Sequence, residues 1–305
     1  MAKKPPAKRT PTPATTGRPA GLFTWIAVGL VVVVVAALVI IKVATGSSTT
    51  GSATYQATSA TVANEVTNVP VSVFNTVGVK SPAVPISPPI PVKGQPALTG
   101  SSGTATLPEV FYLGAEYCPY CAAERWATIV ALSRFGTFSG LGDMISSTRD
   151  IYPGTPTFTF VKAHYRSKYL VFKSVEQYTN VWDNATNFYS TLQTASKIEA
   201  ADFQKYDTPK YIPGMTSQGT GSIPFVSIGN KYLIVGASFT PQLLAGVSRD
   251  TIAAGLSDPT NPVTAAIVAS ANYETAAYCV LTKNQPSTVC ASPGVSAAKK
   301  ALGIK

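Results

Sequence analysis

Two cysteines separated by two residues give this 305-residue chain its clearest potential for chemistry. Cys118, Pro119, Tyr120 and Cys121 follow an apolar stretch and open a predicted helix. A thiol at a helix N-terminus loses its proton more easily, because the partial positive charge there stabilises the thiolate. A thiolate attacks disulfides, and a second thiol one turn away can resolve the mixed disulfide. The motif therefore predicts a redox-active dithiol, with Cys118 as the attacking and Cys121 as the resolving residue.

Three predicted elements would position this dithiol. Residues 109–113 are apolar and read as a buried strand, and residues 118–135 read as a helix with Pro119 at its first position. Much later, the apolar runs 224–228 and 232–235 are joined by Gly229 and Asn230, which predicts a β-hairpin.

The remaining segments give further expectations. Residues 157–163 and 169–175 are rich in aromatic and β-branched residues and predict two strands paired with each other. Residues 179–206 and 262–281 are expected to be helical.

The order of strand, Cys-Pro-Tyr-Cys, helix and later a hairpin opened by Ile223-Pro224 resembles the thioredoxin-like superfamily. More narrowly, residues 114–126 and 131–136 resemble the uncharacterised prokaryotic domain-of-unknown-function family 929. The resemblance implies an α/β, thioredoxin-like fold with a helical insertion between Cys121 and Pro224. It also implies that Pro224 is a cis-proline and that the backbone of Ile223 pairs with the bound substrate, although Pro156 is a rival for the cis position.

The resemblance implies a thiol–disulfide oxidoreductase that needs no cofactor. The Pro-Tyr dipeptide is similar to that of glutaredoxins, but no glutathione site is evident. Oxidase, reductase and isomerase activities therefore all stay open. A different class of function is a non-catalytic envelope scaffold on the same fold, which would bury or permanently oxidise Cys118.

Two carboxylates flank the dithiol in the sequence. Glu116 and Glu124 either relay a proton to Cys121 or are ordinary solvated side chains.

The other two cysteines, Cys279 and Cys290, are expected to form a structural disulfide. Closing a loop of this size stabilises a fold by ~3 kcal/mol in the chain-entropy model. The alternative is a second redox pair that passes electrons to the first. A zinc site is disfavoured, since these two cysteines do not form a second Cys-x-x-Cys, and a single histidine excludes multi-histidine metal centres. We therefore predict no metal.

The basic charge of the chain is concentrated near its start. The formal net charge is +10, yet from Val43 onward 18 basic and 14 acidic side chains leave only +4. A nucleic-acid-binding domain would need a basic stripe on its folded part, so no nucleic-acid partner is expected.

An apolar run at residues 22–41 predicts a membrane anchor. Its 20 residues contain Thr24 as the only polar side chain, and a helix of that length spans ~30 Å, the thickness of the hydrocarbon layer. Lys and Arg before it place the N-terminus in the cytoplasm and the remainder outside. Cleavage as a signal peptide is the alternative.

These features predict a single-pass cell-membrane protein with five parts. They are a basic cytoplasmic tail (1–20), a transmembrane helix (21–43), a flexible linker (44–64), an extracytoplasmic thioredoxin-like domain (65–295) and a C-terminal tail (296–305). Its expected partners are exported proteins with thiols or disulfides and a membrane redox partner.

Overall fold

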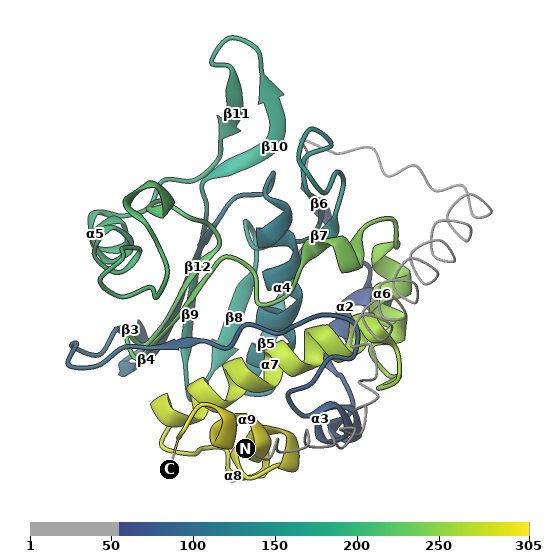
Figure 1. Ribbon diagram of the computed structural model, residues 1–305, viewed down its shortest axis with the longest axis vertical. Coiled ribbons are helices and arrows are strands. Elements are labelled where there is room, and N and C mark those ends of the chain that lie inside the picture. The colour runs from purple at the N-terminus through teal and green to yellow at the C-terminus, as the bar shows by residue number, and fades with distance from the viewer. Residues whose placement is uncertain (1–54, 305) are drawn as a thin grey trace, which may run out of the picture.

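The computed structural model describes residues 55–304 of the chain (Figure 1). The predicted cytoplasmic tail, the predicted transmembrane helix and most of the predicted linker lie outside the described residues. Among residues 55–304, no helix combines the length and the apolar character that crossing a membrane requires.

The centre of the fold is a mixed β-sheet. Strand β4 runs between a parallel neighbour and an antiparallel neighbour, and the antiparallel strand continues into a hairpin. The strands of this sheet are β2 (Ile90–Pro91), β3 (Thr99–Ser102), β4 (Ala105–Gly114), β9 (Val171–Glu176), β12 (Phe225–Ile228) and β13 (Tyr232–Val235). The predicted strand at 109–113 and the predicted hairpin through Gly229 and Asn230 are confirmed. Both turn residues have positive φ, which glycine and asparagine tolerate best.

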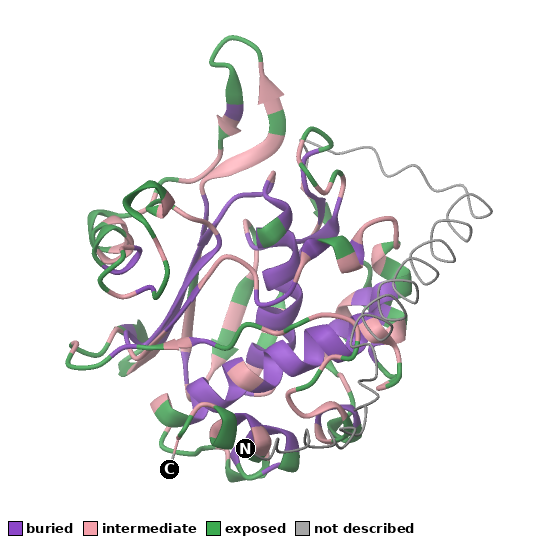
Figure 2. Ribbon diagram, viewed as in Figure 1, coloured by how far each residue is buried: buried purple, intermediate pink, exposed green. Residues whose placement is uncertain are grey.

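Two hydrophobic cores lie on opposite faces of the sheet, because successive side chains of a strand point to opposite sides. Val110 and Tyr112 of β4 belong to the larger core, whereas Phe111 and Leu113 belong to the smaller one. The larger core contains the helices α4 (Pro119–Leu132) and α7 (Pro262–Leu281), which pack against each other. Figure 2 shows both helices buried along nearly their whole length.

The prediction of one helix over 179–206 is wrong, and with it the prediction of a helical insertion. This segment forms β10 (Tyr178–Asp183), β11 (Phe188–Thr191) and only then α5 (Lys197–Tyr206). The residues of the two strands are mostly aromatic, β-branched or threonine, which favour strands. The helix begins later because Ser196 and Glu199 form a capping box. Figure 1 shows the β10–β11 hairpin projecting from the top of the molecule.

The predicted pairing of strands within 157–175 is also wrong. β7 (Pro156–Thr159) pairs with β6 (Gly142–Ile145), β8 (His164–Ser167) pairs with β5 (Gly136–Ser139), and β9 pairs with β4. The residues between the two predicted strands form β8. Residue type favours a strand at each place but does not choose its partner, which tertiary packing decides.

The folded part extends beyond residues 65–295 at both ends. Residues assigned to the linker form β1 (Gln56–Ala57) and the start of α2 (Ala60–Thr67), where Val62 is buried. Residues assigned to the C-terminal tail continue α9 (Pro293–Ala301), whose Ala298 is buried. The other helices are α3 (Val71–Val77), α6 (Arg249–Gly255) and α8 (Ser287–Cys290).

Candidate redox-active dithiol site

Cys118 is the N-cap residue of α4, as predicted. Its backbone is extended, Pro119 occupies the first helical position, and its Sγ accepts a hydrogen bond from the Cys121 N–H at 3.1 Å. The first amides of a helix have no partner within the helix, so a sulfur at this position serves as their acceptor. The helix start thus supplies the donor that a thiolate needs.

The two thiols of this pair are free and differ in acidity. Burial on its own would raise the pKa of Cys118, but the hydrogen bonds from Cys121 and the positive charge of Arg125 outweigh it and lower that pKa. Burial and the neighbouring Cys118 raise the pKa of Cys121. Cys118 is therefore the residue of the pair that ionises first.

The predicted substrate-binding residues lie directly against Cys118. The Ile223–Pro224 peptide bond is cis, whereas the bond before Pro156 is not. The Cys118 thiol donates to the carbonyl oxygen of Ile223 at 3.8 Å. Among the hydrogen bonds of residues 55–304, none has the Ile223 N–H as its donor. The segment before it is held by Asp207, whose carboxylate accepts from the N–H of Ser222 at 2.8 Å.

Both flanking carboxylates are buried, so their interpretation as solvated side chains is wrong. Glu116 accepts a hydrogen bond from the Thr159 hydroxyl at 2.7 Å, and burial raises the pKa of Glu116 to about 7. Glu124 accepts from the Ser238 N–H at 2.7 Å, and burial raises its pKa to about 7 as well. Neither carboxylate hydrogen-bonds to a cysteine among the described residues. Their role as proton relays stays a prediction.

Glu124 has a second buried carboxyl group near it. Glu274 of α7 is fully buried and accepts a hydrogen bond from the Tyr278 hydroxyl. Burial, together with the negative charge of Glu124, raises the pKa of Glu274 well above its usual value. The contact between α4 and α7 therefore contains two buried carboxyl groups, both with a raised pKa.

An ion pair behind the dithiol was not predicted. Arg125 and Glu176 are both fully buried, and the guanidinium binds the carboxylate through two hydrogen bonds of 2.8 and 2.6 Å. The same guanidinium donates to the carbonyl oxygen of Ala115 at 2.8 Å. The signal in the sequence was an arginine one turn after Cys121 in a helix that is otherwise mostly apolar.

An aromatic surface adjoins the dithiol and was missed because the β10–β11 hairpin was predicted to be helical. Tyr117 stacks on Tyr189 with ring centroids 4.2 Å apart, and Tyr120 contacts Tyr152. The N–H of Glu116 donates to the Tyr178 carbonyl oxygen, which ties the hairpin to the dithiol loop. We define the aromatic surface as Tyr117, Tyr120, Tyr152, Tyr178, Trp182, Phe188 and Tyr189.

Several apolar side chains on and beside this surface face solvent. Phe188 and Tyr120 are 40% and 39% exposed, and Val181 and Ile151 are exposed as well. A partner that brings a sulfur atom to Cys118 would meet these side chains.

The second cysteine pair lies elsewhere. Cys279 at the end of α7 and Cys290 in α8 form a disulfide, and both are buried. Figure 1 shows α8 at the end of the molecule opposite the β10–β11 hairpin. The structure therefore does not bring the two pairs together. We keep the interpretation that this disulfide is structural rather than a second redox pair.

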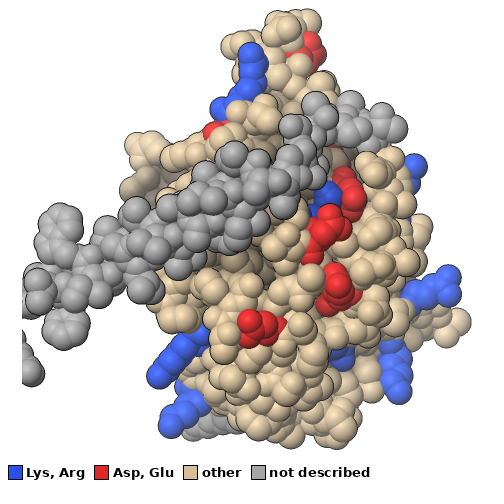
Figure 3. All heavy atoms as spheres, turned by 90° about the vertical axis from the view of Figure 1, so that its right-hand side faces the viewer, with Lys and Arg blue, Asp and Glu red and all other residues tan. Residues whose placement is uncertain are grey.

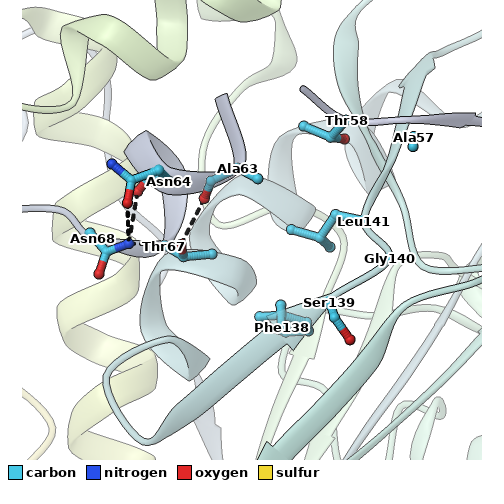
Figure 4. A pocket seen from close by; sticks show the side chains of 10 residues that line it. All are labelled: Ala57, Thr58, Ala63, Asn64, Thr67, Asn68, Phe138, Ser139, Gly140 and Leu141. Atoms are coloured by element: carbon cyan, nitrogen blue, oxygen red, sulfur yellow. Dashed lines mark hydrogen bonds between the residues drawn. The ribbon is translucent and has the colours of Figure 1, made fainter. Parts of the chain in front are cut away.

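The cavity shown in Figure 4 is not part of the predicted site. The cavity in Figure 4 has a volume of about 220 Å³ and is lined by residues of β1, α2 and the β5–β6 turn, and none of the predicted site residues is among them. No group of three or more His, Cys, Asp or Glu in residues 55–304 could hold a metal ion. On the face shown in Figure 3, basic side chains lie mostly near the edges and acidic ones nearer the middle.

Comparisons with known proteins give one match. No curated protein and no solved structure matches the chain. A family model described as "Domain of unknown function (DUF929)" matches residues 101–279, which is more than half of the chain and includes the dithiol, the cis-proline and Cys279. The chain therefore belongs to the DUF929 family.

Proposed function

We propose that this protein is a membrane-anchored, extracytoplasmic thiol–disulfide oxidoreductase that acts on exported proteins. The observation that carries the proposal is the position of the Cys118 sulfur, which accepts the Cys121 N–H at a helix start and lies 3.8 Å from the Ile223 carbonyl oxygen. A thiol in such a position is activated as a nucleophile.

The proposal includes a thioredoxin-like fold. This fold is supported by three features that meet at Cys118: the end of β4, the start of α4 and the cis-proline that opens the β12–β13 hairpin. The insertion that we expected between Cys121 and Pro224 is present as the hairpin and α5, with a different secondary structure from the predicted one.

The reaction needs no group beyond the two thiols and a substrate disulfide. The Cys118 thiolate attacks one substrate sulfur, the substrate S–S bond breaks, and the leaving thiolate takes up a proton. Cys121 then loses its proton and attacks the Cys118 sulfur, which releases the second substrate thiol and leaves a Cys118–Cys121 disulfide. Two electrons pass to the substrate, and the reverse sequence oxidises a substrate dithiol.

The substrate class is supported by the surroundings of the dithiol. The exposed apolar side chains Tyr120, Val181, Phe188 and Ile151 fit unfolded polypeptide segments, which expose their own apolar residues. The Ile223 N–H, which donates no hydrogen bond among residues 55–304, and the Ile223 carbonyl oxygen fit an extended backbone.

The anchor and the partners rest on the sequence. The apolar run at 22–41 would hold the domain at the outer side of the cell membrane, and a membrane protein with a disulfide or dithiol would restore the redox state of Cys118 and Cys121.

The test is the exchange of a model protein's disulfides by the full chain, compared with Cys118→Ala and Cys121→Ala variants. We expect the exchange rate with either variant to equal the rate measured without added protein. A Cys121→Ser variant should accumulate mixed disulfides through Cys118 in cells. Exchange at the wild-type rate by Cys118→Ala would refute the proposal.

A non-catalytic scaffold is the second candidate, and one observation favours it. The Cys118 residue is only 5% exposed, and a scaffold needs no accessible sulfur. Labelling of the reduced, folded protein with iodoacetamide separates the two functions. An enzyme should be alkylated at Cys118 faster than a free cysteine at the same pH, because the lowered pKa of Cys118 gives it more thiolate. A scaffold should resist labelling until it unfolds.

A further inference from the structure

The Arg125–Glu176 ion pair has no role in the reaction as described above. Removing two charges from water is costly, so a pair that is fully buried in both side chains calls for an explanation. A second ion pair that involves β9 joins its half-exposed Lys173 to Glu109 of β4.

The pair is placed to act on the dithiol. Arg125 follows Cys121 by four residues, so both project from the same side of α4. Its Nη2 donates to the Ala115 carbonyl oxygen, which also accepts the N–H of Cys118 at 3.3 Å. The guanidinium is therefore linked through one carbonyl group to the backbone of the nucleophile.

The two ends of the pair are held differently. The carboxylate of Glu176 is occupied by Nε and Nη2 of Arg125, whereas the third nitrogen, Nη1, is buried and has no hydrogen-bond partner among the described residues. Glu176 lies opposite Gly114 at the end of β9. The guanidinium of Arg125 thus retains one nitrogen, Nη1, whose hydrogens find no acceptor among the described residues.

We propose that Arg125 is a positioning residue that stabilises the Cys118 thiolate, and that Glu176 fixes Arg125 and moderates its charge. This inference rests on the proposed function and gives it a direction. Stabilising the thiolate stabilises the reduced dithiol, which makes the Cys118–Cys121 disulfide a stronger oxidant. The protein would then pass its disulfide to substrate dithiols, taking up two electrons, and a disulfide-bearing membrane partner would reoxidise it.

The other titratable groups around the dithiol do not supply this charge. Tyr112 of β4 and Tyr117 are neutral, since burial raises the pKa of both phenols. Tyr120 is likewise neutral, and Glu116 can contribute only negative charge. Arg125 is the positive group whose charge lowers the pKa of Cys118 and opposes the increase at Cys121.

The test uses two substitutions that should shift the Cys118 pKa in opposite directions. Glu176→Gln leaves Arg125 uncompensated, so the Cys118 pKa should fall and the equilibrium with glutathione should shift about tenfold toward the dithiol, as expected for one pKa unit. Arg125→Gln should shift both quantities in the opposite direction by a similar factor, and Arg125→Lys should restore most of the wild-type values. The pKa is read from thiolate absorbance of the reduced protein, and Glu109→Gln is the matched control, with no shift expected.

Three outcomes decide the inference. Shifts of equal sign in Glu176→Gln and Arg125→Gln, or no shift in either, would show that the pair only holds the fold together. If Arg125→Gln does not fold, Glu176→Gln and Arg125→Lys still decide, because the charge argument requires a shift in Glu176→Gln and near-wild-type values in Arg125→Lys. If the wild-type protein does not equilibrate with glutathione at all, the proposed function itself fails.

Discussion

The two cysteine pairs of this protein are both buried and both lie at helix ends, yet their surroundings differ. Cys118 begins α4, accepts a backbone N–H and lies near Arg125, whereas Cys279 and Cys290 join the end of α7 to α8 among apolar residues. Burial alone therefore does not separate a reactive cysteine from a structural one. The difference lies in the hydrogen-bond donors and the charge that face the sulfur.

The largest expected effect comes from removing the reactive sulfur. Cys118→Ala should abolish disulfide exchange while the unfolding free energy of the reduced protein changes little, because no cross-link is lost. The double variant Cys279→Ala/Cys290→Ala should keep the wild-type exchange rate. An exchange rate that depends on the second pair would show that the two pairs form one relay.

The second prediction concerns stability. Loss of the Cys279–Cys290 disulfide should lower the unfolding free energy by about 3 kcal/mol, since an 11-residue separation closes a loop of moderate size. Urea unfolding of the double alanine variant measures this loss. A change near zero would mean that α8 and α9 are held by packing alone.

The third prediction is a pH dependence that originates behind the dithiol. The pKa of Glu124 is raised by burial from 4.5 to about 7, so the folded state binds its proton more tightly than the unfolded state. This contribution is fully present below pH 4.5 and is lost as the pH rises to about 7, which costs about 3 kcal/mol. Glu124→Gln should remove this loss.

The measurement is urea unfolding at pH 4.5 and pH 8. A Cys118→Ala/Cys121→Ala background keeps thiol ionisation from contributing. Glu116 titrates in the same range and remains in the variant, so the pH dependence should be reduced rather than abolished. If the unfolding free energy changes equally between pH 4.5 and pH 8 with and without Glu124, the raised pKa of Glu124 is contradicted.

The smallest expected effect is on substrate binding. Val181→Ser with Phe188→Ser should raise KM for an unfolded protein substrate about fivefold, from the loss of roughly 1 kcal/mol of apolar contact. The rate with a small disulfide should be unchanged. Val71→Ser is the matched control, since Val71 is 60% exposed and lies on α3. An equal KM in all variants would show that Val181 and Phe188 do not contribute to substrate binding.

The sequence was sufficient for the local parts of the site. The cap at Cys118, the helix from Pro119, the turn at Gly229-Asn230 and the cis bond before Pro224 all depend on short-range chemistry or on the stated resemblance. The disulfide between Cys279 and Cys290 followed from the cysteine count.

The parts that failed depend on long-range packing. The partner of Arg125 is 51 residues away, and the β10–β11 hairpin is positioned by contacts of Tyr117 with Tyr178 and Tyr189. Glu124 looked solvated because its neighbours, Ser238 and Glu274, come from distant segments. No periodicity within one segment reveals such partners.

The most direct test of the central claim is an equilibrium titration of the Cys118–Cys121 pair in glutathione redox buffers, with mass spectrometry reporting the state of each cysteine. We expect one reversible two-electron transition between about −270 and −120 mV, nearer the oxidising end, while Cys279–Cys290 stays oxidised throughout. A Cys118–Cys121 pair that remains entirely reduced or entirely oxidised across this range would contradict the assignment of this site as a redox-active dithiol.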